Sequence, residues 1–376
     1  MKYKFEDIIF NITEKKKPVE EDKYNYIGLE HLESGNLFIS KWGSDTAPEG
    51  EKIVMKKGDV LFGKRRAYQK KVAISPIDGI FSAHGMVLRP KEDVICKEFL
   101  PFFISSETFL NEAIRISVGG LSPTVNWKDI REQEFDLPSL AEQKVLAEKL
   151  WAAYEVKQSY LKMIEATEKM VKSQFVEMFG DCESNAHNFQ IKKVGDFAEC
   201  FAGATPSTKV SAYWDNGNIP WMSSGEVHKG RVKDTDAKIS QQGYDGCSTK
   251  MVPAHSVVIA LAGQGKTRGT VAINDIELCT NQSLCAIVPN EEVNYEYLYH
   301  NLRGRYKELR SMSGDVDGRG GLNLKHIQSI KVVVPPMEEQ LKFVSIAQQA
   351  DKSISELRKS VDAIDKVIKS LINENL

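Results

Sequence analysis

The sequence predicts an α+β protein built as an internal repeat, with two similar mixed α/β domains and two long helices that pair as an antiparallel coiled coil. Two observations carry this prediction. A series of residues recurs once at a constant offset of 197, as Gln143 and Gln340 do, and each copy runs directly into a long segment with helical periodicity. A duplicated domain with a duplicated helix implies a pseudo-two-fold arrangement, and two such arms suit a target that is itself bipartite. The recurring pairs are Asn126 and Asn323, Lys128 and Lys325, Ile130 and Ile327, Pro138 and Pro335, Glu142 and Glu339, and Gln143 and Gln340.

The repeat divides the chain of 376 residues into four segments. A chain of this length accommodates two domains with separate cores. We expect a first mixed α/β domain over residues 1–137, a helix within 138–180, a second domain over 181–334 and a helix within 335–376. Short apolar or alternating runs bounded by Gly, Pro and Asp are typical of strands. The expected strands are 60–62, 71–74, 86–88, 257–260, 270–273 and 283–288, and the expected shorter helices are 98–112 and 294–309.

The two long helices carry a coiled-coil pattern. From Glu142 to Phe179 the sequence contains no Pro or Gly, and apolar positions follow in steps of four and three. A helix with a single apolar stripe is unstable alone in water, so each helix needs a partner, and the other helix is the simplest one. The alternative is that each helix docks only on its own domain. The first seam is Leu146, Leu150, Ala153, Lys157, Tyr160, Ile164, Thr167, Val171, Gln174 and Met178. The second seam is Phe343, Ala347, Ala350, Ile354, Leu357, Val361, Ile364, Ile368 and Leu371.

Three polar residues interrupt the first seam, where the second seam is apolar. These residues are Lys157, Thr167 and Gln174. Polar core positions either weaken a coiled coil or fix its register. Both readings remain open at the level of the sequence.

The composition is that of a soluble globular protein, with 41% hydrophobic and 27% charged residues. No run approaches the ~18 consecutive apolar residues of a membrane span, and the N-terminus lacks the apolar core of a signal peptide. We therefore expect a cytoplasmic protein with reduced cysteines and no membrane partner. A formal net charge of −2 argues against indiscriminate coating of nucleic acid, but it permits a binder whose basic residues are concentrated locally.

The sequence contains no complete catalytic or nucleotide-binding motif. Gly265-Lys266-Thr267 resembles the end of a phosphate-binding loop, but Ala260 stands where the first glycine is required, and a strand pattern follows. The Asn/Asp-Pro-Pro-aromatic tetrapeptide of amino-methyltransferases is also absent, as is metal-ligand spacing among the seven histidines or six cysteines. We therefore expect no catalytic residue, no metal and no cofactor in this chain.

Two loops offer the chemistry of nucleic-acid binding. Between matching anchors, such as Tyr26-Ile27 and Trp221-Met222, the two halves differ in their loops, which suggests two similar surfaces that read different things. Arginine, glutamine and lysine supply contacts to base edges and phosphates. The alternative is that the charged run is only a solvated face. The candidate residues are Lys64, Arg65, Arg66, Tyr68, Gln69 and Lys70 in the first half, and Gln264, Lys266, Thr267, Arg268 and Arg319 in the second.

Several motifs together resemble the specificity subunit of type I restriction–modification enzymes. They are the duplicated Pro…Glu-Gln helix starts, GKRRAYQKKVAISPIDGIFSAHGMVLRP, GGLSPTVNW, YWDNGNIPWMSSGEV and the Gly-Gln-Gly-Lys-Thr-Arg-Gly loop. The resemblance covers nearly the whole chain and preserves the order of domain, helix, domain, helix.

The resemblance implies two target recognition domains, each reading one half of a split double-stranded DNA sequence, with residues 143–179 and 340–371 setting the unread spacer. It also implies two modification subunits, which carry S-adenosylmethionine and methylate adenine N6, and restriction subunits with translocase and nuclease activity. This chain would then be a non-catalytic DNA-recognition subunit. Two other readings remain: a DNA-modifying enzyme in its own right, and a scaffold with two peptide-binding arms.

Overall fold

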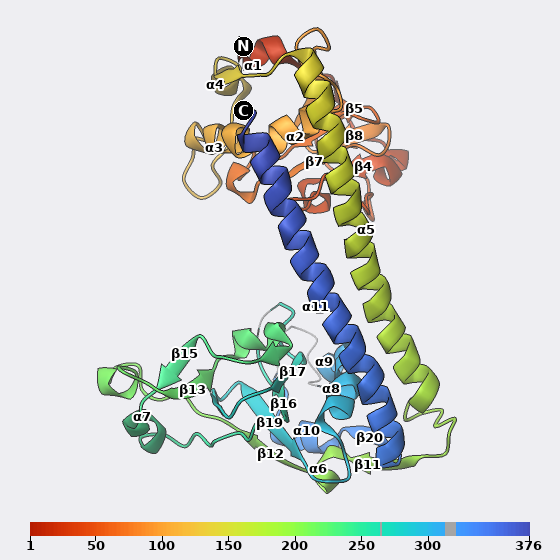
Figure 1. Cartoon of the computed structure of the whole chain (residues 1–376), viewed down its shortest axis with the longest axis vertical. Helices are drawn as coiled ribbons and strands as arrows, with labels where there is room; N and C mark the ends of the chain where they lie inside the picture. Colours follow the sequence, from red (N-terminus) through yellow and green to blue (C-terminus); the bar gives the residue numbers. More distant parts are fainter. Residues whose placement is uncertain (264, 313–320) are drawn as a thin grey trace. The chain divides into compact units, whose positions relative to one another are not determined.

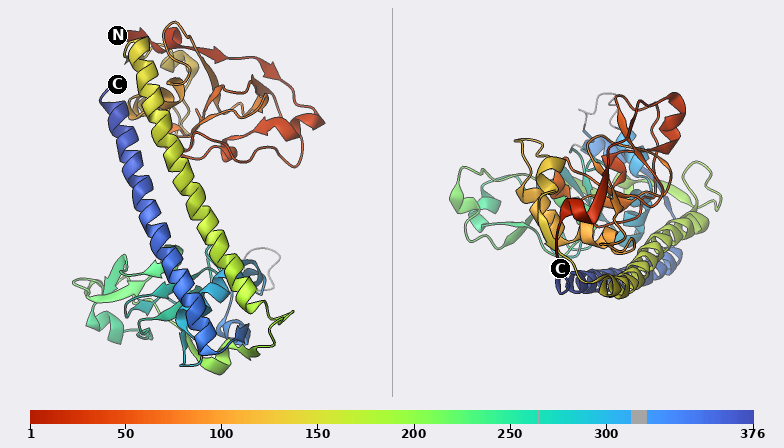
Figure 2. Two further views of the ribbon diagram at one scale, coloured as in Figure 1. Left: turned by 45° about the vertical axis from the view of Figure 1, so that its right-hand side comes forward. Right: turned by 90° about the horizontal axis from the view of Figure 1, so that it is seen from above.

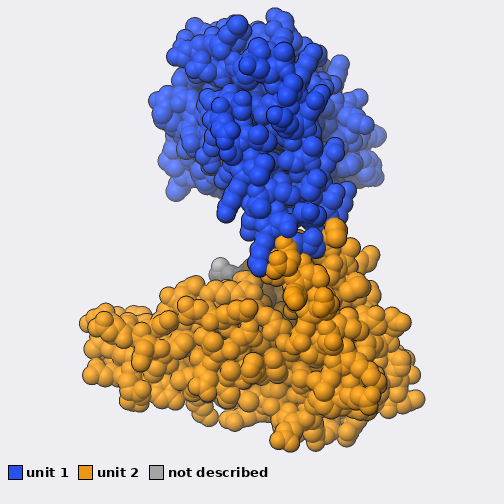
Figure 3. Space-filling model, in the orientation of Figure 1, with its two compact units in different colours: residues 1–162, 357–376 blue, residues 163–356 orange. Residues whose placement is uncertain are grey.

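The computed structural model (Figure 1) describes residues 1–263, 265–312 and 321–376. The chain forms two compact units (Figure 3). Unit 1 comprises residues 1–162 and 357–376, and unit 2 comprises residues 163–356. Each unit therefore contains one globular domain and a part of each long helix.

The long helices are α5, Leu140–Phe179, and α11, Met337–Asn373. A capping box starts α5, because the Ser139 N–H donates to the Glu142 carboxylate at 2.8 Å and the Glu142 N–H donates to the Ser139 hydroxyl at 3.4 Å. All 19 predicted seam positions are buried or half-buried. The spacing of apolar residues thus located both helices to within about three residues of their ends.

The two helices pair with each other within both units, as Figures 1 and 2 show. In unit 1, Leu146 and Leu150 near the start of α5 share a core with Ile372 at the end of α11. In unit 2, the Phe175 ring near the end of α5 lies 5.1 Å from the Phe343 ring near the start of α11. The start of one helix thus packs on the end of the other, which confirms the antiparallel coiled coil. The alternative, in which each helix docks only on its own domain, is wrong.

The polar seam position Lys157 has a partner across the helix pair. Its ammonium group lies 2.6 Å from the Asp365 carboxylate of α11, and only 11% of the Lys157 side chain is exposed. A half-buried ion pair of this kind is satisfied only in one alignment of the helices, which favours the reading that Lys157 fixes the register.

Unit 1 contains two four-stranded sheets and a short ribbon. The first sheet has the antiparallel order β2-β9-β6-β7, and the second has the order β3-β5-β8-β4, in which β4 and β8 are parallel. The strands are β1 Lys2–Lys4, β2 Ile9–Ile12, β3 Lys15–Lys16, β4 Tyr26–Ile27, β5 Lys52–Met55, β6 Val60–Phe62, β7 Val72–Ile74, β8 Gly79–Phe81, β9 Met86–Pro90 and β10 Glu134–Asp136. The short helices are α1 Phe5–Ile8, α2 Leu100–Ser105, α3 Glu107–Arg115 and α4 Trp127–Ile130.

Unit 2 repeats this plan. Its first sheet has the order β12-β19-β16-β17-β14, and its second has the order β15-β13-β18. The strands are β11 Gln190–Lys193, β12 Ala198–Ala202, β13 Ile219–Met222, β14 Arg231–Val232, β15 Ala237–Ile239, β16 Ser256–Ala260, β17 Val271–Asn274, β18 Cys279–Thr280, β19 Leu284–Pro289 and β20 Lys331–Val334. The short helices are α6 Val194–Phe197, α7 Gln241–Asp245, α8 Tyr295–Gly304, α9 Tyr306–Ser311 and α10 Leu324–Ser329.

The repeat extends to individual pairings. Tyr26 pairs in parallel with Ile80, and Trp221 pairs in parallel with Cys279, so the matched anchors occupy the same place in the two second sheets. In both units a first strand, β1 or β11, pairs with the strand that precedes the long helix, β10 or β20. The six predicted strands are confirmed.

Each predicted medium-length helix is in fact two helices. The segment 98–112 breaks at Ser106, whose hydroxyl caps α3 by accepting a 3.1 Å hydrogen bond from the Phe109 N–H. The segment 294–309 breaks at Arg305, which separates α8 from α9. In the part of the chain that the structure describes, no helix is long and apolar enough to cross a membrane.

The buried glutamines of the repeated motif make the same three hydrogen bonds in both units. The Gln143 amide group accepts from the Cys96 N–H and donates to the carbonyls of Val94 and Pro138, at 2.8 to 3.0 Å. Gln340 does the same with Asn294, Glu292 and Pro335, at 2.8 to 2.9 Å. The first turn of each long helix is thus bonded to its own domain.

Candidate nucleic-acid interface

The two predicted basic loops occupy the same position in the two units. Residues 63–71 connect β6 to β7, and residues 261–270 connect β16 to β17. Each pair of strands lies in the first sheet of its unit, and all residues of β6 and β16 are buried. The fold therefore presents two loops of different sequence from equivalent strands.

The loop of unit 1 makes a sharp turn. Residues Ala67–Gln69 form one 3₁₀ turn, flanked by Arg66 and Lys70 in the left-handed conformation, with φ of 58° and 51°. This conformation is uncommon for residues other than Gly and Asn, and it is found mainly where surrounding contacts impose it. The turn places the side chains of Arg66 and Tyr68 on the surface, and 52% of Tyr68 is exposed.

A neighbouring segment, residues 118–125, holds this loop. The Arg66 N–H donates to the Pro123 carbonyl at 2.7 Å, and the Val125 N–H donates to the Lys64 carbonyl at 3.0 Å. The Arg66 guanidinium also donates to the Ser122 hydroxyl at 3.2 Å. Residues 118–125, which contain Gly119 and Gly120 and precede Asn126, thus form part of the same surface.

Positive charge is dense around this loop. An Arg65 guanidinium nitrogen lies 3.2 Å from His84 Nε2. Burial lowers the pKa of His84, and the neighbouring charges of Arg65, Lys64 and Lys52 lower it further. The pKa of Lys64 is also lowered, by burial first and then by Lys15. Cations that repel one another in this way are stabilised by a bound anion, as the phosphate groups of DNA would provide.

The loop of unit 2 differs in detail. Lys266 is exposed, and the Thr267 hydroxyl lies 3.2 Å from His228 Nε2. The Tyr306 hydroxyl donates to the Lys266 carbonyl at 3.1 Å, and Arg310 donates to the Gly265 carbonyl. Side chains of helix α9 thus support this loop by bonding to the backbone carbonyls of the loop.

Arg268 points inward, with only 5% of the residue exposed. Sequence reasoning placed it with the exposed cations, because neither a pattern nor a spacing marks a buried arginine in a polar loop. Gln264 and Arg319 lie outside the described residues. The structure also brings His84 and His228 against the two loops, although nothing in the spacing of the histidines indicated this.

The chain thus consists of two similar domains, and each domain presents a loop of different sequence from equivalent strands. The chain matches the family model of the type I restriction modification DNA specificity domain twice, over residues 2–164 and 186–364. Because the two matches cover most of its length, the chain belongs to the type I restriction–modification DNA-specificity family.

Two curated relatives and one solved structure show the extent of the similarity. A type I restriction enzyme specificity subunit of Escherichia coli is 27% identical over 163 residues, which are 43% of this chain and 40% of that protein. The putative MjaX specificity subunit of Methanocaldococcus jannaschii is 22% identical over 98% of this chain and 89% of its own length. The S subunit from M. genitalium has the same fold, with a TM-score of 0.57 and 15% identity over 99% of this chain and 94% of that one.

Proposed function

We propose that this chain is the DNA-specificity subunit of a type I restriction–modification complex. Residues 1–137 and 181–334 act as two target recognition domains, and each reads one half of a bipartite double-stranded DNA sequence. Residues 138–180 and 335–376 supply the helices that set the unread spacer. The chain itself performs no catalysis and binds no cofactor.

The observation that carries this proposal is the equivalent placement of two loops with different sequences. Loops 63–71 and 261–270 leave matching strands of matching sheets, although residues 118–125 support the first loop and helix α9 supports the second. Two copies of one reading surface with different side chains suit a target whose two halves differ in sequence. The basic surroundings of the first loop supply the affinity for phosphate that such reading requires.

The residues that we propose as DNA contacts differ in their exposure. Arg66, Tyr68 and Lys266 are exposed and available to bases and phosphates, whereas the buried Arg268 reaches DNA only if its loop rearranges. The full set is Lys64, Arg65, Arg66, Tyr68, Gln69 and Lys70 in the first domain, and Gln264, Lys266, Thr267, Arg268 and Arg319 in the second.

In this proposal, partner subunits carry out the catalytic reactions. Two modification subunits bind the helices and recognition domains, carry S-adenosylmethionine and methylate adenine N6. Restriction subunits with translocase and nuclease activity complete the complex. The family membership supports these partners, and so does the absence from the sequence of the Asn/Asp-Pro-Pro-aromatic motif of an amino-methyltransferase.

The test is a map of methylated adenines in DNA from cells that express this chain with its modification subunit. We expect methylation confined to one asymmetric motif of two short sequences separated by a fixed spacer. Methylation without a bipartite motif would contradict the proposal. S-adenosylmethionine binding by the purified chain alone would instead favour a DNA-modifying enzyme.

A further inference from the structure

About two to three turns after each bonded glutamine, the long helix contacts its domain through different chemistry in the two units, and we call this contact the joint. In unit 1 the contact is a cluster of four aromatic residues. The Trp151 ring of α5 stacks on Phe38 at 6.0 Å and lies 4.9 Å from Phe102. Tyr154, one turn later, lies 5.3 Å from Phe38, and its hydroxyl donates to Asn36 at 2.8 Å. This joint is mostly apolar.

The repeat identifies the same places in unit 2. The offset of 197 that relates Gln143 to Gln340 relates Trp151 to Gln348 and Tyr154 to Asp351 on α11. Instead of stacking rings, Gln348 donates to the Glu296 carboxylate at 3.4 Å. Asp351 forms an ion pair with Arg231 at 3.5 Å. At these two helix positions, the rings of unit 1 are thus replaced by a polar and a charged group.

Arg231 occupies the place that Phe38 has in unit 1. The Ile74 N–H donates to the Leu37 carbonyl, and the Ile273 N–H donates to the Gly230 carbonyl, both at 2.9 Å. Ile74 and Ile273 are equivalent, because each pairs with the first apolar residue of the strand before the loop, Val60 or Val257. The residues that follow these two carbonyls are Phe38 and Arg231.

Arg231 links three elements of unit 2. Its guanidinium lies 2.5 Å from Glu296 on α8, 3.3 Å from Asp275 after β17 and 3.5 Å from Asp351 on α11. Only 3% of the Glu296 side chain is exposed, so its charge depends on this partner. Hydrogen bonds from a planar guanidinium are directional. The network therefore fixes the orientation of the Arg231 guanidinium relative to α8 and α11, as well as its distance from them.

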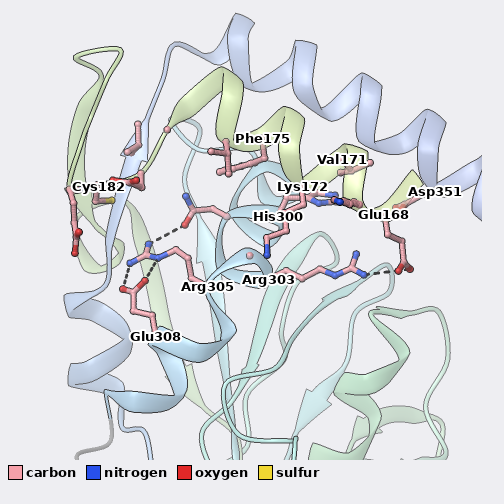
Figure 4. A pocket seen from close by; sticks show the side chains of 18 of the residues that line it. Glu168, Val171, Lys172, Phe175, Cys182, His300, Arg303, Arg305, Glu308 and Asp351 are labelled. Atoms are coloured by element: carbon pink, nitrogen blue, oxygen red, sulfur yellow. Dashed lines mark hydrogen bonds and ion pairs between the residues drawn. The ribbon is translucent and has the colours of Figure 1, made fainter. Parts of the chain in front are cut away.

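A hollow of about 770 Å³ lies beside this joint in unit 2 (Figure 4). Asp351 and His300 line it, together with Val171 and Phe175 of α5. Cys96 and Asn294 bond to the equivalent glutamines, so Phe102 and His300, each six residues later, are equivalent positions, and the ring of Trp151 lies 4.9 Å from Phe102. The His300 ring instead lies 5.3 Å from Phe343, so the second joint combines apolar packing at the start of α11 with the charged contact of Asp351 about two turns later.

We propose that Arg231 is a positioning residue, which orients the second recognition domain on α11 through Asp351 and Glu296. This inference rests on the proposed function. Strand β14, which carries Arg231, pairs with β17, and β17 directly follows the loop 261–270. A change in the Arg231–Asp351 contact is thus transmitted through β17 to the loop 261–270.

The test uses Asp351→Asn, which removes the helix-side charge but leaves the buried Arg231–Glu296 pair intact. The matched control is Tyr154→Phe, which removes the hydroxyl from the other joint. Each variant is assembled with its modification subunits, and its binding is measured with the mapped target and with duplexes altered in one half at a time.

We expect Asp351→Asn to lose about tenfold of its discrimination at one half-site and no more than about twofold at the other. Tyr154→Phe, which keeps the ring contacts of the apolar joint, should stay within about twofold of the wild type at both half-sites, and Asp351→Glu, which keeps the carboxylate, should retain discrimination at the first half-site. A lower unfolding temperature with unchanged discrimination at both half-sites would overturn the positioning role. A wild-type complex that discriminates at neither half-site would refute the proposed function itself.

Discussion

Lengthening both long helices by seven residues tests whether they set the spacer in the DNA target. The insertions follow Lys162 in α5 and Glu356 in α11, at the boundary between the two units in each helix. Seven residues preserve the steps of four and three in both seams, so the Lys157–Asp365 pair and the Phe175–Phe343 contact keep their alignment on either side.

The expected magnitude follows from helix geometry. At ~1.5 Å per residue, seven residues add ~10.5 Å to each helix between its unit 1 portion and its unit 2 portion. B-form DNA rises ~3.4 Å per base pair, so the spacer should lengthen by about three base pairs. The added residues rotate a straight helix by only ~20°, whereas three base pairs turn one half-site by about 100° relative to the other, so engagement of both loops requires the DNA to untwist or the domains to turn.

The assay is the map of methylated adenines, with the variant in place of the wild-type chain. We expect the two half-site sequences to be unchanged and the spacer to be longer. As a control, an insertion in α5 alone shifts one seam against the other and should abolish methylation. Methylation by the double variant at the original spacer would refute the idea that the helices act as a ruler.

Three other predictions concern single residues. Arg66→Asn, which tolerates the left-handed backbone, should weaken specific DNA binding by ~1–3 kcal/mol if Arg66 contacts a base, whereas an equal loss on unrelated DNA in a binding titration would assign it to phosphate. Gln340→Ala should destabilise unit 2 by ~2–4 kcal/mol in urea unfolding, because three buried hydrogen bonds are lost, and Gln143→Ala should do the same to unit 1; a change below ~0.5 kcal/mol would contradict this. Burial, with smaller contributions from Arg303 and Arg231, lowers the pKa of His300 to about 3. The unfolded chain binds this proton near pH 6.5, so stability should fall as the pH drops below that value, and His300→Phe should remove ~2 kcal/mol of the loss between about pH 7 and about pH 5 in thermal unfolding.

The sequence predicted the parts of the fold that depend on local pattern. The steps of four and three defined both long helices, because a seam must face its partner at every turn. The constant offset between Gln143 and Gln340 predicted the repeat, and the structure extends it to the hydrogen bonds of both glutamines. Both observations need only residue type and spacing.

Features that depend on partners distant in the chain could not be predicted. The break at Ser106, by contrast, is local, because the hydroxyl caps the N–H of Phe109 only three residues later. The burial of Arg268 depends on how its loop packs, and the Arg231 network joins residues from three separate elements. The identity of a charged residue does not show whether its side chain contacts water, DNA or another side chain in the core.

The bonded glutamines have a mechanical consequence. The first turn of α5 or α11 cannot rotate about its axis without breaking three short hydrogen bonds to its own domain. Any torque applied along a helix, for example by a bound protein, is therefore delivered to the attached domain as rigid turning and is not absorbed at the connection. In the proposed complex, a partner subunit that twists either helix would therefore also turn the domain that carries loop 63–71 or loop 261–270.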